Sequence, residues 1–85
     1  MSQMELVDEP VDVTAILDED GQFVPQQLVW RQRRYPVVNV GRQWDEENRR
    51  FTLVEVADGT RFELQLDRAT LAWRIKKIWW GQIIA

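Results

Sequence analysis

Short runs of alternating apolar and polar residues, separated by turn residues, repeat along most of the chain and limit the folds it can adopt. Successive side chains of a β-strand point to opposite faces, so this alternation predicts half-buried strands. In residues 61–66 every second residue is Phe or Leu and is predicted to face the core, while the others face water. The preceding pair, Asp58-Gly59, is the strongest hairpin signal, because this pair readily adopts the positive φ of a tight turn.

The strands and turns together predict an all-β fold. We expect an antiparallel meander of five to six strands, forming a small barrel or a strongly twisted sheet. The expected strands are residues 11–17, 23–31, 35–44, 51–57, 61–66 and 71–80. Pro25 cannot donate a backbone hydrogen bond, so its strand is expected to lie at an edge or to begin after it. Gly41 is expected to mark a bulge or a bend.

Residues 71–80 also fit a second interpretation, an amphipathic helix ending at Gly81. We favour a strand, because Ile and Trp have high strand propensity and the preceding units are hairpins. The domain organisation predicted from these patterns is a flexible acidic N-terminus over residues 1–10, followed by a single small β domain over residues 11–85.

Five tryptophans are available for the core of this 85-residue chain. Each buried aromatic ring removes about 150–250 Å² from water, so a small domain depends on a few of them. Trp44 and Trp73 are the tryptophans expected in the core, whereas Trp30 adjoins a group of arginines. Trp79 and Trp80 point to opposite faces of a strand, so one of the two is expected to be exposed.

The chain contains no cysteine and no histidine. Zinc, iron–sulfur and haem sites that need thiolate or imidazole ligands are therefore excluded, as is any histidine general base. We expect no enzymatic activity, no cofactor and no small-molecule substrate. The chain also lacks an apolar run of about 20 residues and a signal peptide, so we expect a cytoplasmic protein that does not contact a membrane.

Charge is distributed unevenly along the chain, whose net charge is −3. Residues 1–20 hold seven acidic residues and no cation, giving −7, while the rest holds all 11 cations and the other seven acidic residues, giving +4. This asymmetry indicates either nucleic-acid contact or a segment that shields the basic body. An acidic segment that only aids solubility fits the same pattern.

Basic and aromatic residues alternate repeatedly, and nine of the 11 cations are arginine. Arginines and aromatic rings together bind phosphates and stack on bases, although any half-buried strand produces a similar alternation. The candidate nucleic-acid-binding residues are Arg31, Arg33, Arg34, Tyr35, Arg74 and Lys76. The apolar end of the chain is an alternative interface, for a protein partner or a homodimer. Its candidate residues are Trp79, Trp80, Ile83 and Ile84.

Residues 28–80 contain a series of aromatic and turn motifs: Trp-Arg-x-Arg-Arg-Tyr-x-Val from Trp30, then Trp44, the Asp-Gly hairpin with Arg-Phe-Glu-Leu, and Trp-Arg-Ile with a closing Trp. With these motifs the segment resembles a small bacterial domain of unknown function. Similar segments end Y-family polymerase-like chains of mutagenic repair operons. The resemblance implies a bacterial source and a link to DNA repair, and it assigns no catalytic residue. Gln32 departs from the family, which often has Gly there.

The sequence therefore predicts a non-enzymatic bacterial binding module that contacts nucleic acid in a DNA-repair context. The alternative is a module for protein–protein interaction or self-association that uses the aromatic C-terminal end.

Overall fold

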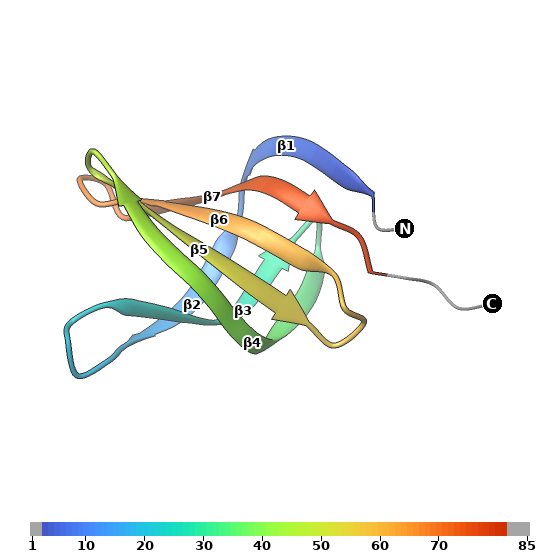
Figure 1. Cartoon of the computed structure of the whole chain (residues 1–85), viewed down its shortest axis with the longest axis horizontal. Helices are drawn as coiled ribbons and strands as arrows, with labels where there is room; N and C mark the ends of the chain where they lie inside the picture. The colour runs from blue at the N-terminus through green and yellow to red at the C-terminus, as the bar shows by residue number, and fades with distance from the viewer. Residues whose placement is uncertain (1–2, 82–85) are drawn as a thin grey trace.

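The computed structural model describes residues 3–81, which form one seven-stranded antiparallel sheet (Figure 1). The strands are β1 (Met4–Pro10), β2 (Asp12–Leu17), β3 (Phe23–Trp30), β4 (Arg33–Glu46), β5 (Arg49–Val56), β6 (Arg61–Asp67) and β7 (Ala72–Trp79). Their order in the sheet is β1-β7-β6-β5-β4-β3-β2. The all-β meander is confirmed, with seven strands in place of five to six. Within the described range there is no helix that could cross a membrane.

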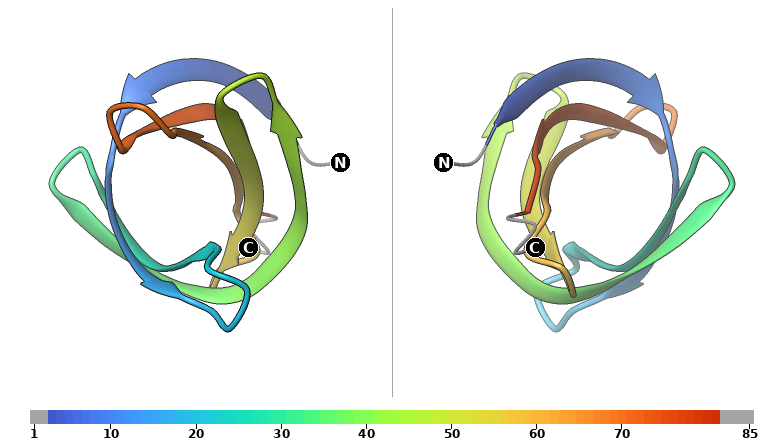
Figure 2. Two further views of the ribbon diagram at one scale, coloured as in Figure 1. Left: turned by 90° about the vertical axis from the view of Figure 1, so that its left-hand side faces the viewer. Right: turned by 90° about the vertical axis from the view of Figure 1, so that its right-hand side faces the viewer.

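The two edge strands of the sheet, β1 and β2, are consecutive in the chain and are separated only by Val11. The sheet therefore curls until its two edge strands join end to end through this residue, and viewed end-on it looks nearly circular (Figure 2). Val11 is buried at this junction, and its N–H donates to the carbonyl oxygen of Trp73 at 3.2 Å. The hydrogen bonding does not continue round the circle, so the fold is a barrel-like twisted sheet and not a closed barrel.

Strand β1 corrects the prediction of a flexible N-terminus, because Met4–Pro10 pairs with β7. The segment holds three carboxylates, and the adjacent pairs Leu6-Val7 and Asp8-Glu9 interrupt the apolar–polar alternation that would indicate a strand. Val7 packs against the core, while Glu5 and Glu9 stay accessible to water and accept hydrogen bonds from the indole N–H groups of Trp80 and Trp30.

The predicted turns and bulge are largely confirmed. Gly21 and Gly59 occupy the β2–β3 and β5–β6 turns with φ of 77° and 87°. The pairing of β4 with β5 shifts register between Val40 and Gln43, which confirms a bulge at Gly41. Pro25, however, lies inside β3, which has β2 and β4 as neighbours. It is tolerated there because β3 pairs with β4 only from Gln27 onward.

The core confirms that apolar residues of β6 point inward, and it corrects the choice of tryptophan. Leu28, Phe62 and Leu64 are fully buried, and Trp30 is 4% exposed. Trp44 instead lies outside the core and is half-buried. The bulge explains the error. It inserts one residue into β4, so that after the bulge the side chain of Gln43, and not that of Trp44, lies on the face of the sheet that holds the core residues.

Strand β7 confirms the strand interpretation of residues 71–80. Trp73 is half-buried and packs against the core, which agrees in part with its predicted role. Glu63 and Gln65 of β6, predicted to face water, are each only 7% exposed. Strand β6 lies between β5 and β7, where Phe51 is opposite Gln65 and Lys77 is opposite Glu63, so neighbouring side chains cover its outer face.

Candidate nucleic-acid interface

The densest group of predicted site residues lies at the turn between β3 and β4. Trp30 pairs with Arg33, which leaves Arg31 and Gln32 as the two turn residues. Both have positive φ, 50° and 65°, which is the conformation of a type I′ hairpin turn. We define the arginine cluster as Arg31, Arg33, Arg34 and Tyr35. These residues are adjacent in the chain around the tight turn; Arg33 and Tyr35 lie on one face of β4 and Arg34 lies on the other.

Aromatic rings support two guanidinium groups of the arginine cluster. The Cζ atom of Arg31 lies 4.3 Å from the ring centroid of Trp30, and that of Arg33 lies 5.7 Å from the ring of Tyr35. Tyr35 is half-buried and packs edge-to-face on Phe62, with a centroid distance of 5.3 Å. Each ring thus anchors an arginine to the core and leaves the guanidinium at the surface.

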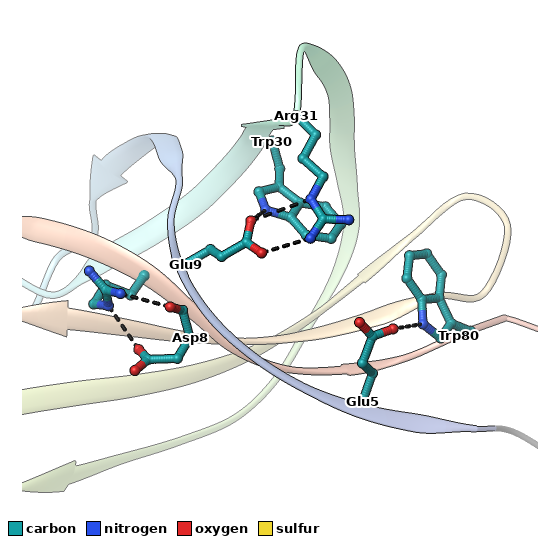
Figure 3. Close-up of polar contacts among 7 residues, drawn as sticks. Glu5, Asp8, Glu9, Trp30, Arg31 and Trp80 are labelled. Carbon is teal, nitrogen blue, oxygen red and sulfur yellow. Dashed lines mark hydrogen bonds and ion pairs between the residues drawn. The ribbon is translucent and has the colours of Figure 1, made fainter.

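Glu9 of β1 neutralises Arg31. Its Oε2 accepts a hydrogen bond from Nη2 of Arg31 at 2.7 Å, and its Oε1 accepts from Nε of Arg31 at 3.3 Å and from Nε1 of Trp30 at 3.0 Å (Figure 3). These bonds to Arg31, then to Trp30, lower the pKa of Glu9. Neither Arg33 nor Arg34 forms an ion pair within residues 3–81.

The remaining predicted residues, Arg74 and Lys76, lie apart from the arginine cluster on β7. Asp8 of β1 binds both of them: its Oδ1 is 2.8 Å from Nε of Arg74 and 2.9 Å from Nζ of Lys76. The hydrogen bonds from Arg74 and then Lys76 lower the pKa of the Asp8 carboxyl. The structure thus divides the predicted site into two parts, with β1 between them.

The acidic strand β1 lies against the basic part of the chain. Its carboxylates pair with cations there, as the shielding interpretation of the charge asymmetry expects. Asp8 and Glu9 leave the ribbon in opposite directions, and Glu5 accepts a hydrogen bond from Nε1 of Trp80 at 3.0 Å (Figure 3). Sequence reasoning missed these pairings individually. The opposite charges of the two parts of the chain were the signal for them, but charge alone does not give strand register.

The predicted apolar interface lies at the end of β7. Trp79 and Trp80 are both half-buried, so the prediction that one is exposed was wrong. Trp80 packs against Trp30, at a centroid distance of 6.4 Å. Beside the two tryptophans is an open groove of about 500 Å³, also lined by Leu53, Glu55, Gly59, Arg61 and Gly81. Ile83 and Ile84 lie outside the described residues.

A further aromatic surface lies on the outer face of β4 and β5. Trp44 stacks on Phe51, with centroids 5.3 Å apart and planes at 6°, and Cζ of Arg42 lies 5.0 Å from the ring of Trp44. Glu46 accepts a hydrogen bond from Nε1 of Trp44 at 3.0 Å, which places a carboxylate beside the stack. This carboxylate makes the surface less suited to a phosphate chain than the arginine cluster.

Comparison of the chain with protein-family models, curated proteins and solved structures finds no match. The resemblance to the bacterial domain and to repair-polymerase segments therefore stays a prediction. Among residues 3–81 no group of three or more acidic side chains is gathered as a metal site would require.

Proposed function

We propose that the protein is a non-enzymatic binding module that contacts single-stranded nucleic acid through the arginine cluster. The observation that carries this proposal is that Arg33 and Arg34 lie beside a tight turn, with no ion-pair partner in the described part of the chain. Guanidinium groups bind phosphates, and those held over aromatic rings also stack on bases. The bacterial cytoplasm and DNA repair as the setting rest on the sequence arguments and the resemblance alone.

The experiment is a fluorescence-anisotropy titration of a labelled single-stranded oligonucleotide at low salt. Each phosphate contact with a single strand contributes about −0.7 to the slope of log K against log salt concentration. We therefore expect Arg33→Ala/Arg34→Ala to bind more weakly and to make the slope shallower by about 1.4. Arg49→Ala/Arg61→Ala, which removes the same charge from exposed positions elsewhere, is the control. Equal weakening by both double variants would contradict the assignment.

A second candidate function is self-association through the groove beside Trp79 and Trp80. The groove, of about 500 Å³, favours it because apolar and charged groups line the same opening: Leu53 and the two tryptophans, with Glu55 and Arg61 directly opposite each other. Sedimentation equilibrium tests this candidate. A dimer that Trp79→Ser weakens supports it, and a monomer at high concentration rejects it.

A further inference from the structure

Asp8 occupies an unusual place in β1. The pairing of β1 with β7 shifts register between Leu6 and Glu9, so Val7 and Asp8 form a bulge opposite Lys76. Asp8 also has a φ of 56°, a left-handed conformation that non-glycine residues seldom adopt. Bulges re-aim side chains, and this one directs the Asp8 carboxylate towards β7.

The cations of β7 converge on one oxygen of that carboxylate. Oδ1 of Asp8 binds Nε of Arg74 at 2.8 Å and Nζ of Lys76 at 2.9 Å, and Nη2 of Arg74 donates to the backbone carbonyl of Asp8 at 2.7 Å. An arginine and a lysine that share one anionic oxygen form an arrangement that also suits a phosphate oxygen.

The Asp8 carboxylate is accessible to a competitor. Its side chain is 58% exposed, and those of Arg74 and Lys76 are 39% and 31% exposed. Ion pairs this exposed to water contribute little to stability and are screened by salt. An anion from solution can therefore replace the carboxylate without unfolding the sheet.

We propose that Arg74 and Lys76 form a binding site for a phosphate group of the nucleic-acid backbone, which the Asp8 carboxylate occupies in the free protein. Strand β1 then competes with the ligand, and binding requires the Asp8 side chain to turn away. This inference rests on the proposed function, since Arg74 and Lys76 provide a second contact with the nucleic acid in addition to the arginine cluster. In the free protein Asp8 shields this second contact.

The test compares Asp8→Asn with Asp12→Asn, which removes one negative charge from an exposed residue of β2 that forms no ion pair among the described residues. Asn, like Asp, tolerates a left-handed conformation, so the bulge is retained. We expect Asp8→Asn to bind the oligonucleotide about tenfold more tightly at low salt, with a slope steeper by about 1.4 for two freed cations. Asp12→Asn should change the affinity less than about twofold, because it frees no cation.

A second measurement does not depend on nucleic acid. In an NMR titration with inorganic phosphate, the Nε–H signal of Arg74 should shift in Asp8→Asn and much less in the unsubstituted protein. The phosphate site is overturned if the Arg74 signal shifts in neither protein and Asp8→Asn and Asp12→Asn bind the oligonucleotide equally. In that case, oligonucleotide binding that still depends on Arg33 and Arg34 upholds the proposed function. If phosphate shifts the signal but no variant binds an oligonucleotide, the site stands and the nucleic-acid function fails.

Discussion

Replacing Trp30 tests the structural core directly, because the sequence patterns predicted Trp44 and Trp73 as the core tryptophans. Trp30 is 4% exposed and packs edge-to-face on Phe62 at 6.1 Å. A ring of about 150–250 Å² at about 25 cal/mol per Å² gives an upper bound of about 4–6 kcal/mol for its burial. Trp→Ala substitutions in cores cost about 3–5 kcal/mol, and we expect this loss in the free energy of unfolding for Trp30→Ala.

Trp44→Ala is the matched control. Trp44 is half-buried and keeps mainly its stacking on Phe51, so we expect a loss of about 1–2 kcal/mol. Urea unfolding followed by far-ultraviolet circular dichroism gives both values. If Trp30→Ala does not fold, Trp30→Phe should still fold and lose about 1–2 kcal/mol, for part of the ring and the indole hydrogen bond to Glu9. A larger loss for Trp44→Ala than for Trp30→Ala would refute the assignment of the core.

Four further variants have expected outcomes. Gln32→Gly should raise the free energy of unfolding by about 1 kcal/mol in urea, because Gln32 has a φ of 65° and glycine adopts this conformation without strain; a decrease would contradict the type I′ turn. Gly81→Ala should lower it by about 1–3 kcal/mol, since a Cβ there would clash with the carbonyl oxygen of Asp58, and an unchanged melting temperature would count against that contact. Burial raises the pKa of Glu63, so its charge destabilises the fold as pH rises above the ordinary carboxyl pKa of about 4. Glu63→Gln should therefore raise the melting temperature near neutral pH and not below about pH 4, whereas an equal effect at both would exclude titration as its cause. The pKa values of Asp8 and Glu9 are lowered by their cationic partners, so these carboxylates stabilise the fold above about pH 4 and lose this effect as pH falls through their lowered pKa values. Melting curves of Asp8→Asn/Glu9→Gln should accordingly fall less steeply with acid than those of the unsubstituted protein, and parallel pH profiles would contradict this.

The sequence predicted those features of the fold that depend on interactions between residues close together in the chain. The Asp58-Gly59 turn and the inward-facing Phe and Leu residues of β6 depend on neighbours in the chain, and both were predicted correctly, whereas the burial of Glu63 and Gln65 depends on the adjacent strands. The bulge at Gly41 was also predicted, yet its consequence for Trp44 was not, because one inserted residue reverses the faces of every residue after it.

In the candidate site, too, contacts between residues close together in the chain were predictable and contacts between residues far apart in the chain were not. The arginine cluster could be located from the sequence because its residues are neighbours in the chain around a single tight turn. Its relation to β1 could not be predicted, since Glu9 and Arg31 are 22 residues apart and Asp8 and Arg74 are 66 apart. Pairing over such distances depends on which strands become neighbours when the sheet curls.

The most direct test of the account is chemical-shift mapping of the full chain by NMR during titration with a single-stranded oligonucleotide. We predict that the largest changes fall on Arg33, Arg34 and Tyr35, followed by Arg74 and Lys76. The absence of any change at low salt, or changes confined to the groove beside Trp79 and Trp80, would contradict the proposed nucleic-acid interface.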